Sequence, residues 1–104
     1  ADVTSTCTLG GATTITISQG NTTVNDSSET SPLRQMTDGG SQFLNYNLYT
    51  DSTLASVWGN TIGTGAAVTA TGSAVTTTVH GAIDFGQSVG AASFSDSVTV
   101  TLTY

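Results

Sequence analysis

The sequence has very few of the residues on which most protein chemistry depends. Its 104 residues include one cysteine, one histidine, one proline and one basic side chain, Arg34, and charged residues make up 8% of the chain. Seven acidic residues outnumber Arg34 and give a formal net charge of −6. Nucleic acid and anionic lipid attract cationic proteins, so neither is an expected partner of this chain.

Long apolar runs are also missing. No stretch approaches the roughly 18 consecutive apolar residues that span a bilayer, and the first four residues lack the basic and apolar regions of a signal peptide. We therefore expect a mature, secreted chain without membrane insertion. Apolar residues make up 37% of the sequence and fall in short ordered runs, which favours a folded chain. The length is enough for a single domain, residues 1–104, and too short for two.

Cys7 has no second cysteine with which to form a disulfide inside this sequence. Two interpretations remain open. Its partner lies upstream or in another chain, or Cys7 is a small buried thiol.

Residues that support catalysis or metal binding are scattered. His80 lies at the end of an expected strand without neighbouring metal ligands, so we predict a structural or surface role for it. The acidic residues lie in turn-like settings, and Gly63–Gly65 lacks the lysine of a phosphate-binding loop. We expect no enzyme activity, no cofactor and no metal site.

Apolar residues alternate with hydroxyl-bearing and amide residues in short runs, which predicts an all-β fold with almost no helix. The runs cover residues 3–7, 15–17, 44–48, 66–70, 75–79 and 98–104. Glycine-rich turns separate them, and the spacing is typical of a sandwich or barrel. Residues 18–32 are polar, with Val24 as the only aliphatic residue, and predict a long exposed loop. The seven aromatic residues are expected to pack in the core rather than line a binding face.

The last run is a clean amphipathic strand with one apolar face, formed by Val98, Val100, Leu102 and Tyr104. Such a strand ordinarily pairs within its own sheet. An edge that stays unpaired invites a strand from another chain.

Several blocks of sequence, in this order and spacing, resemble the spore coat protein U domain, the subunit type of archaic chaperone–usher pili. The blocks are LNYNLYTD at 44–51, VWG at 57–59, VHGAI at 79–83 and SFSDSVTVTLTY at 93–104. DVTSTCT at 2–8 resembles the family's strand that carries the second cysteine.

The resemblance implies an incomplete immunoglobulin-like β-sandwich that lacks one strand. A periplasmic pilus chaperone and then the donor segment of a neighbouring pilin subunit would supply that strand, with the outer-membrane usher as a further partner. Val98, Val100, Leu102 and Tyr104 would border the groove and pair with the incoming strand. Cys7 would form a disulfide with a cysteine in an N-terminal part that precedes residue 1 and also contains the donor segment and the first strand.

The function implied is that of a structural pilin, which passes through the periplasm into an extracellular pilus for adhesion and biofilm formation. Head-to-tail contacts of this kind give an open filament. One alternative is a tip adhesin domain with Trp58, Ile62, Phe85 or Phe94 exposed together at one end. Others are a self-complete carbohydrate-binding sandwich, a weak hydrolase on the same scaffold, and a coat protein of spores.

Overall fold

The computed structural model describes residues 2–6, 10–83, 86–87 and 89–103. Cys7, Phe85 and Tyr104, for which roles are predicted above, lie outside these residues. The molecule is elongated, with extents of 48 × 25 × 24 Å. Its strands are β1 (Asp2–Thr6), β2 (Ala12–Ile17), β3 (Arg34–Thr37), β4 (Phe43–Tyr49), β5 (Ala66–Thr69), β6 (Ala74–Thr78), β7 (His80–Ile83) and β8 (Val100–Thr103).

Helix is almost absent from the described part of the chain. It is limited there to a short 3₁₀ turn, η1 (Ile62–Thr64). No helix among the described residues is long and apolar enough to cross a membrane.

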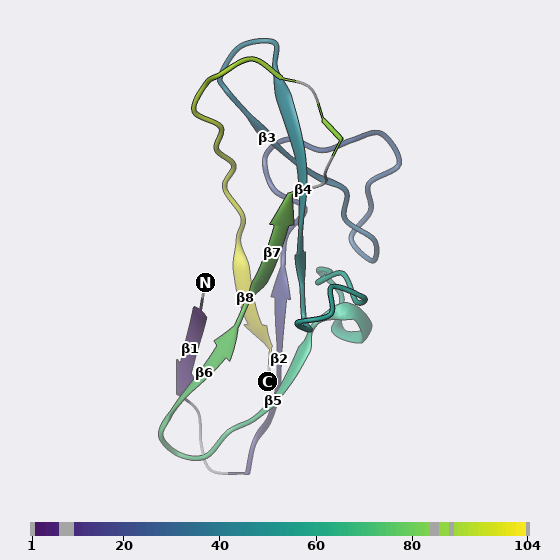
Figure 1. Cartoon of the computed structure of the whole chain (residues 1–104). Helices are drawn as coiled ribbons and strands as arrows, with labels where there is room; N and C mark the ends of the chain where they lie inside the picture. The colour runs from purple at the N-terminus through teal and green to yellow at the C-terminus, as the bar shows by residue number, and fades with distance from the viewer. Residues whose placement is uncertain (1, 7–9, 84–85, 88, 104) are drawn as a thin grey trace.

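The strands form two layers. One is an antiparallel sheet in the order β5-β2-β8, and the other contains the antiparallel sheet β3-β4-β7. β1 and β6 form a separate antiparallel pair. Because β6 runs into β7 through Val79 alone, this pair prolongs the second layer (Figure 1). The predicted all-β sandwich is confirmed.

Strand alternation turns one face of each layer towards the core. Ile15 and Ile17 of β2 are 0% and 1% exposed, and Val3 of β1 and Leu48 of β4 pack against this core. Hydroxyl residues such as Thr76 occupy the exposed positions in between. All six runs predicted from alternation overlap observed strands, whereas the sequence pattern did not predict β3 or β7.

Trp58 fills the space between the two layers and is fully buried. Its indole N–H donates a hydrogen bond to the carbonyl oxygen of Ile15 in β2 (2.8 Å). Its main-chain N–H donates to the carbonyl oxygen of Leu48 in β4 (2.8 Å). The prediction that aromatic residues pack in the core is confirmed for Trp58.

The polar segment 18–32 is a loop, as predicted, but it folds back along β3 instead of projecting into solvent. The Val24 N–H donates to the Leu33 carbonyl (3.0 Å), and the Gln35 N–H donates to the Thr22 carbonyl (3.1 Å). Pro32, at the end of the loop, is buried. The loop therefore covers the outer edge of β3.

Candidate strand-binding groove

The main-chain groups of β8 face alternately towards β2 and away from it. The Ser18 N–H donates to the Thr99 carbonyl (2.9 Å), and the register pairs Ile17 with Val100 and Ile15 with Leu102. Since bonded and non-bonded pairs alternate in an antiparallel ladder, the N–H and C=O groups of Val100 and Leu102 point away from β2. β8 is the outermost strand of its sheet among the described residues, so these groups face an unoccupied edge.

The side chains of the same residues face the core. Val100 lies opposite Ile17, and Leu102 lies opposite Ile15, so they share the inner face of the sheet. Val98 and Leu102 pack against the core, yet Val100 between them is 43% exposed. An inward-facing valine that is this exposed marks a place where the core has no cover.

The opposite wall of this opening is built by β3, β4 and β7. Leu48 faces the core and lies opposite Gly81, so Gly81 shares the inner face. A Cβ on Gly81 would lie 3.5 Å from Leu48 Cδ2, so the missing side chain leaves room beside Leu48. Tyr46 and Ile83 form the next pair along the same face, and Ile83 is 56% exposed.

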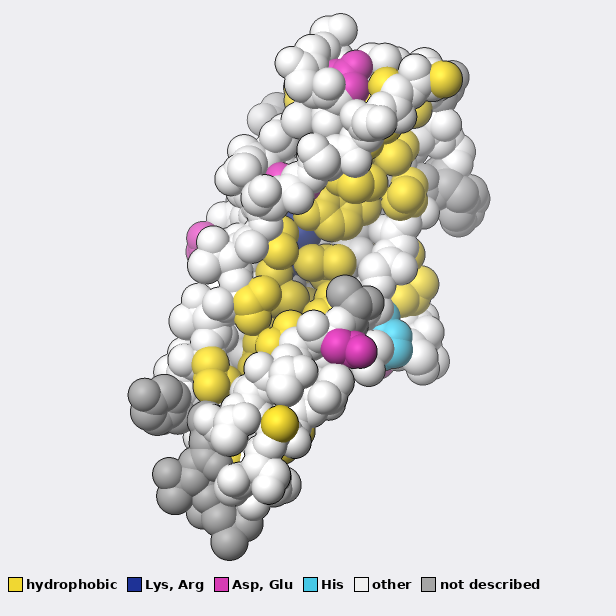
Figure 2. Space-filling view, turned by 90° about the vertical axis from the view of Figure 1, so that its left-hand side faces the viewer, with side chains coloured by type: hydrophobic (Ala, Val, Ile, Leu, Met, Phe, Trp, Pro, Cys, Tyr) yellow, Lys and Arg dark blue, Asp and Glu magenta, His cyan; other side chains and the backbone are white. Residues whose placement is uncertain are grey.

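A cavity of about 420 Å³ lies against this wall, lined by Met36, Tyr46, Gly81, Ala82 and Ile83. We call the opening between this wall and Val98, Val100 and Leu102 the groove. Figure 2 shows a nearly continuous band of hydrophobic side chains along the same side of the molecule, hollowed near its middle. The groove thus combines an unoccupied strand edge with apolar surface of the kind that an added strand covers.

Loop segments bond to main-chain groups of β2, β3 and β4 that no neighbouring strand pairs with. The covering contacts are Ile17 N–H to the Gly59 carbonyl (3.1 Å) for β2, Trp58 N–H to the Leu48 carbonyl for β4, and Thr37 N–H to the Ser95 carbonyl (3.0 Å) for β3. Protein chains commonly protect edges in this way. On β8, by contrast, the outward main-chain groups of Val100 and Leu102 face the groove.

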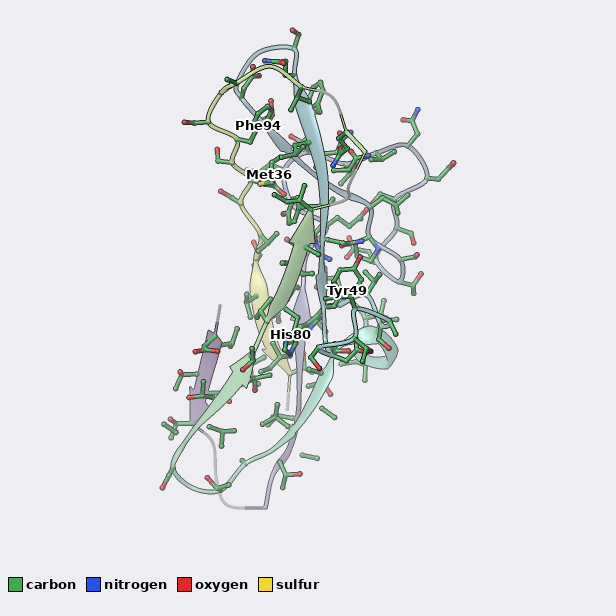
Figure 3. All side chains as sticks on the ribbon, in the orientation of Figure 1. Met36, Tyr49, His80 and Phe94 are labelled. Atoms are coloured by element: carbon green, nitrogen blue, oxygen red, sulfur yellow. The ribbon has the colours of Figure 1, made fainter. Side chains whose placement is uncertain are left out.

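The segment before β8 crosses from one layer to the other. Ser95 pairs with Thr37 of β3 through two main-chain hydrogen bonds of 3.0 Å, and Thr99 already pairs with Ser18 at the end of β2. Figure 3 shows Phe94, at the start of this segment, beside Met36 of β3. One end of the groove is therefore closed by the chain itself.

Tyr46 and Asp96 link the two walls. The Tyr46 hydroxyl donates to Asp96 Oδ2 (2.6 Å), and Asp96 Oδ1 accepts the Asn21 N–H (3.0 Å). Burial, and then the hydrogen bond to Asp96, raise the pKa of Tyr46, so its hydroxyl stays a protonated donor.

We expect Tyr46→Phe to lower the free energy of unfolding by about 1 to 2 kcal/mol, because the bond to a carboxylate is lost and the ring is kept. Urea denaturation measures this change. Tyr49→Phe is the matched control, since its hydroxyl has no hydrogen bond to a described residue. Equal effects of the two variants would show that the link contributes nothing.

Arg34, the single basic residue of the sequence, is buried. It is 1% exposed. Its Nε donates to the Ser18 carbonyl (3.0 Å) and its Nη1 to Asn47 Oδ1 (2.8 Å). Its Nη2 donates to the carbonyls of Ile17 (3.0 Å) and Trp58 (2.7 Å). Arg34 therefore joins both layers and the Trp58 segment through four hydrogen bonds.

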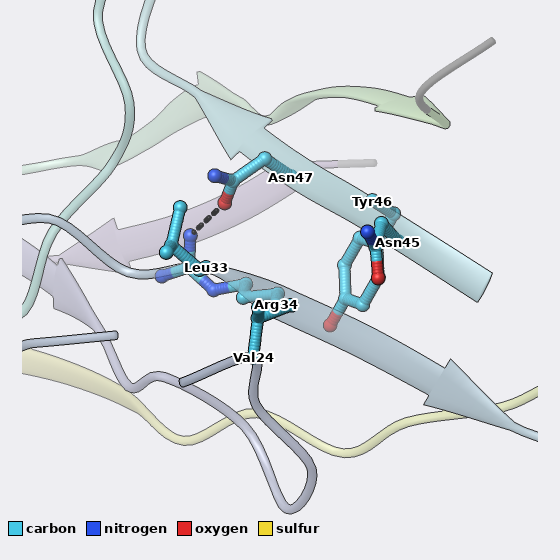
Figure 4. A pocket seen from close by; sticks show the side chains of 6 residues that line it. All are labelled: Val24, Leu33, Arg34, Asn45, Tyr46 and Asn47. Atoms are coloured by element: carbon cyan, nitrogen blue, oxygen red, sulfur yellow. Dashed lines mark hydrogen bonds between the residues drawn. The ribbon is translucent and has the colours of Figure 1, made fainter. Parts of the chain in front are cut away.

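No carboxylate of a described residue hydrogen-bonds to the Arg34 guanidinium. Burial lowers its pKa, and the negative charges of Asp96 and Glu29 partly oppose that shift. Figure 4 shows Arg34 beside a small cavity of about 130 Å³, which is also lined by Val24, Leu33, Asn45, Tyr46 and Asn47. This volume is well below the roughly 300 Å³ at which ligand pockets begin, so we interpret Arg34 as structural.

Among the described residues, those considered for chemistry are not brought together. His80 is half-buried and lies opposite Tyr49 across the sheet (Figure 3). The described residues contain no group of three or more metal-ligating side chains. Gly86–Gly90 has the Gly-x-Ser-x-Gly spacing, but that motif acts between a strand and a helix, and no helix follows it within residues 89–103.

The structure places three of the four predicted groove residues, Val98, Val100 and Leu102, together on one wall. Tyr104 and the predicted disulfide residue Cys7 lie outside the described residues. The opposite wall was not predicted from the sequence, although the alternation in 44–48 places Tyr46 and Leu48 on one face.

The sequence profile of the Spore Coat Protein U domain matches residues 1–101. The chain belongs to the spore coat protein U domain family. Protein U of Myxococcus xanthus is 37% identical over 99 residues, which is 94% of this chain and 55% of Protein U. The chain thus spans about half the length of this curated relative.

A solved structure shares the fold of this spore coat protein U domain. It is the CsuC–CsuE chaperone–tip adhesion subunit pre-assembly complex from the archaic chaperone–usher Csu pili of Acinetobacter baumannii. The match has a TM-score of 0.69 and 18% identity, and it covers 100% of this chain and 33% of the matched chain. The predicted family and fold class are confirmed.

Proposed function

We propose that this domain is a structural pilin subunit that assembles by accepting a β-strand from another chain along β8. One observation carries the proposal: the outward main-chain groups of Val100 and Leu102 border a groove in which apolar side chains are exposed. A strand placed there would gain main-chain hydrogen bonds to β8, and its alternate side chains would cover the groove.

The first occupant would be a periplasmic pilus chaperone, and a neighbouring pilin would replace it after the outer-membrane usher is reached. Membership of the spore coat protein U domain family supports this proposal, and so does a fold shared with a chaperone–subunit complex. Repetition of one head-to-tail contact would give an extracellular filament for adhesion and biofilm formation.

We further propose that residues 1–104 act as one domain whose donor segment and first strand lie N-terminal to residue 1. Cys7 would then pair with a cysteine in that segment, in the oxidising periplasm. Mass spectrometry of the full-length protein from periplasm, with and without reductant, tests the pairing. A free thiol at Cys7 in the non-reduced protein would contradict it.

The tip adhesin alternative gains no support from the exposed apolar residues that it requires. Trp58 is fully buried, so its proposed place in an exposed cluster is wrong. Ile62 is 60% exposed, but η1, which contains it, lies on the opposite side of the molecule from the segment that carries Phe94 (Figures 1 and 3).

A synthetic peptide tests strand addition. In the test peptide valine alternates with threonine over nine residues or so, about the length of a long strand, and lysines at its ends keep it soluble. The control peptide has the same composition without alternation. We expect the test peptide to raise the urea midpoint of the chain, by about 2.7 kcal/mol in stability at 100 times its Kd. An equal response to both peptides would overturn the proposal.

Val100→Asp should abolish that response. Because Val100 is 43% exposed, the variant should unfold within about 1 kcal/mol of the wild type without peptide. Thr101→Asp is the matched control, since Thr101 is exposed on the outer face of the same strand. Val100→Asp that still responds to the peptide would show that the strand binds elsewhere.

A further inference from the structure

A side chain closes the edge of β4 where its pairing with β7 stops. Tyr46 and Ile83 are the last residues that pair in the register of these two strands. At the next residue of β4, the Asn45 N–H donates to Gln87 Oε1 (2.6 Å), and Gln87 Nε2 donates to the Asn45 carbonyl (2.8 Å). Gln87 thus makes both bonds that a strand residue would make to Asn45.

The direction of these bonds follows from the ladder. The Leu48 carbonyl accepts the Trp58 N–H on the β3 side of β4. Because main-chain groups of successive strand residues point to opposite sides, the odd-numbered residues of β4, Asn45 among them, face the β7 side. Gln87 therefore bonds to the same side of β4 as β7 does, one residue beyond the end of the β4–β7 ladder.

Exposed apolar side chains surround this part of β4, so an unpaired edge here would invite a foreign strand. Ile83, Phe43 and Val89 are 56%, 43% and 40% exposed. Exposed apolar side chains beside unpaired main-chain groups invite a foreign strand. A second glutamine, Gln42, accepts the Gly90 N–H through Oε1 and holds the Gln87 segment at the start of β4.

We propose that Gln87 is a specificity-determining residue, whose amide acts as a strand substitute on β4 and confines strand addition to β8. The closure of β4 stands by itself, while the role in assembly rests on the proposed function. The Gln87 amide makes the two hydrogen bonds to β4 that an incoming strand would make. A side chain has no second strand edge, so no further strand can add to it.

The test uses Gln87→Ala and Gln87→Met, the second of which keeps the length of the side chain. Gln35→Ala is the matched control, because Gln35 also bonds to Asn45 but only to its side-chain Oδ1 (2.9 Å). Native mass spectrometry counts how many alternating valine–threonine peptides bind per chain. We expect one on the wild type and on Gln35→Ala, and two on either Gln87 variant.

The outcomes separate the two proposals. One peptide on every variant would overturn the role of Gln87. No peptide on the wild type but one on a Gln87 variant would overturn addition at β8 and support the closure of β4.

Hydrogen exchange tests the closure on the wild type alone. The Asn45 amide should exchange at least about tenfold more slowly than exposed loop amides. Exchange as fast as those amides would overturn the closure.

Discussion

Arg34→Met is expected to lower the free energy of unfolding by about 3 kcal/mol or more. The change removes four donors from the carbonyls of Ser18, Ile17 and Trp58 and from Asn47 Oδ1. Each buried acceptor left without a partner costs about 1 to 3 kcal/mol. Relief from burying a charge offsets part of this loss, because no carboxylate within the described part of the chain hydrogen-bonds to Arg34.

Urea denaturation measures the loss, and two further variants define its cause. Arg34→Lys keeps the charge but has no planar fork of donors, so we expect it to recover less than half of the difference. Gln35→Met, at the neighbouring half-buried position, should change stability by about 1 kcal/mol or less. If Arg34→Met unfolded at the wild-type urea concentration, the hydrogen bonds of Arg34 would not stabilise the fold.

Trp58→Ala is expected to cost about 3 to 5 kcal/mol, the range for removing a large buried aromatic side chain. Trp58 bonds to Ile15 in one layer and to Leu48 in the other, so removal of its side chain leaves a cavity between the two layers. A thermal or urea melt of the variant measures the effect. Ile62→Ala, at a position 60% exposed, is the control and should change stability little.

Trp58→Phe separates packing from hydrogen bonding at the same position. Phenylalanine keeps most of the ring but leaves the Ile15 carbonyl without the indole donor. We expect a loss of about 1 to 3 kcal/mol from that change. A Trp58→Phe variant as stable as the wild type would show that the bond to Ile15 is dispensable.

The strands that the sequence predicted are those whose own residues alternate. β2, β4 and β8 have apolar side chains at alternate positions over part of their length, such as Ile15 and Ile17, Tyr46 and Leu48, and Val100 and Leu102. β3 and β7 were missed because RQMT and HGAI have little alternation. Their extended form comes from pairing with the two edges of β4, which is a tertiary effect.

The groove was predictable on one side only. Alternation showed the apolar face of the strand that carries Val98, Val100 and Leu102, and the family resemblance implied that this strand borders a groove. Gly81 and Met36 join the opposite wall through the topology of the sheet, and no local pattern indicates that. The burial of Arg34 was likewise hidden, since a lone arginine in a polar sequence ordinarily lies at the surface.

The crossing of the last segment between the two layers has a mechanical consequence. Ser95 is bonded to β3 and residues 99–103 are bonded to β2, so tension along this segment reaches both sheets. Hydrogen bonds between antiparallel strands lie across the strand axis, so a pull along β8 strains several of them together and does not open them one after another. A filament built on this strand would share its load between both halves of each subunit.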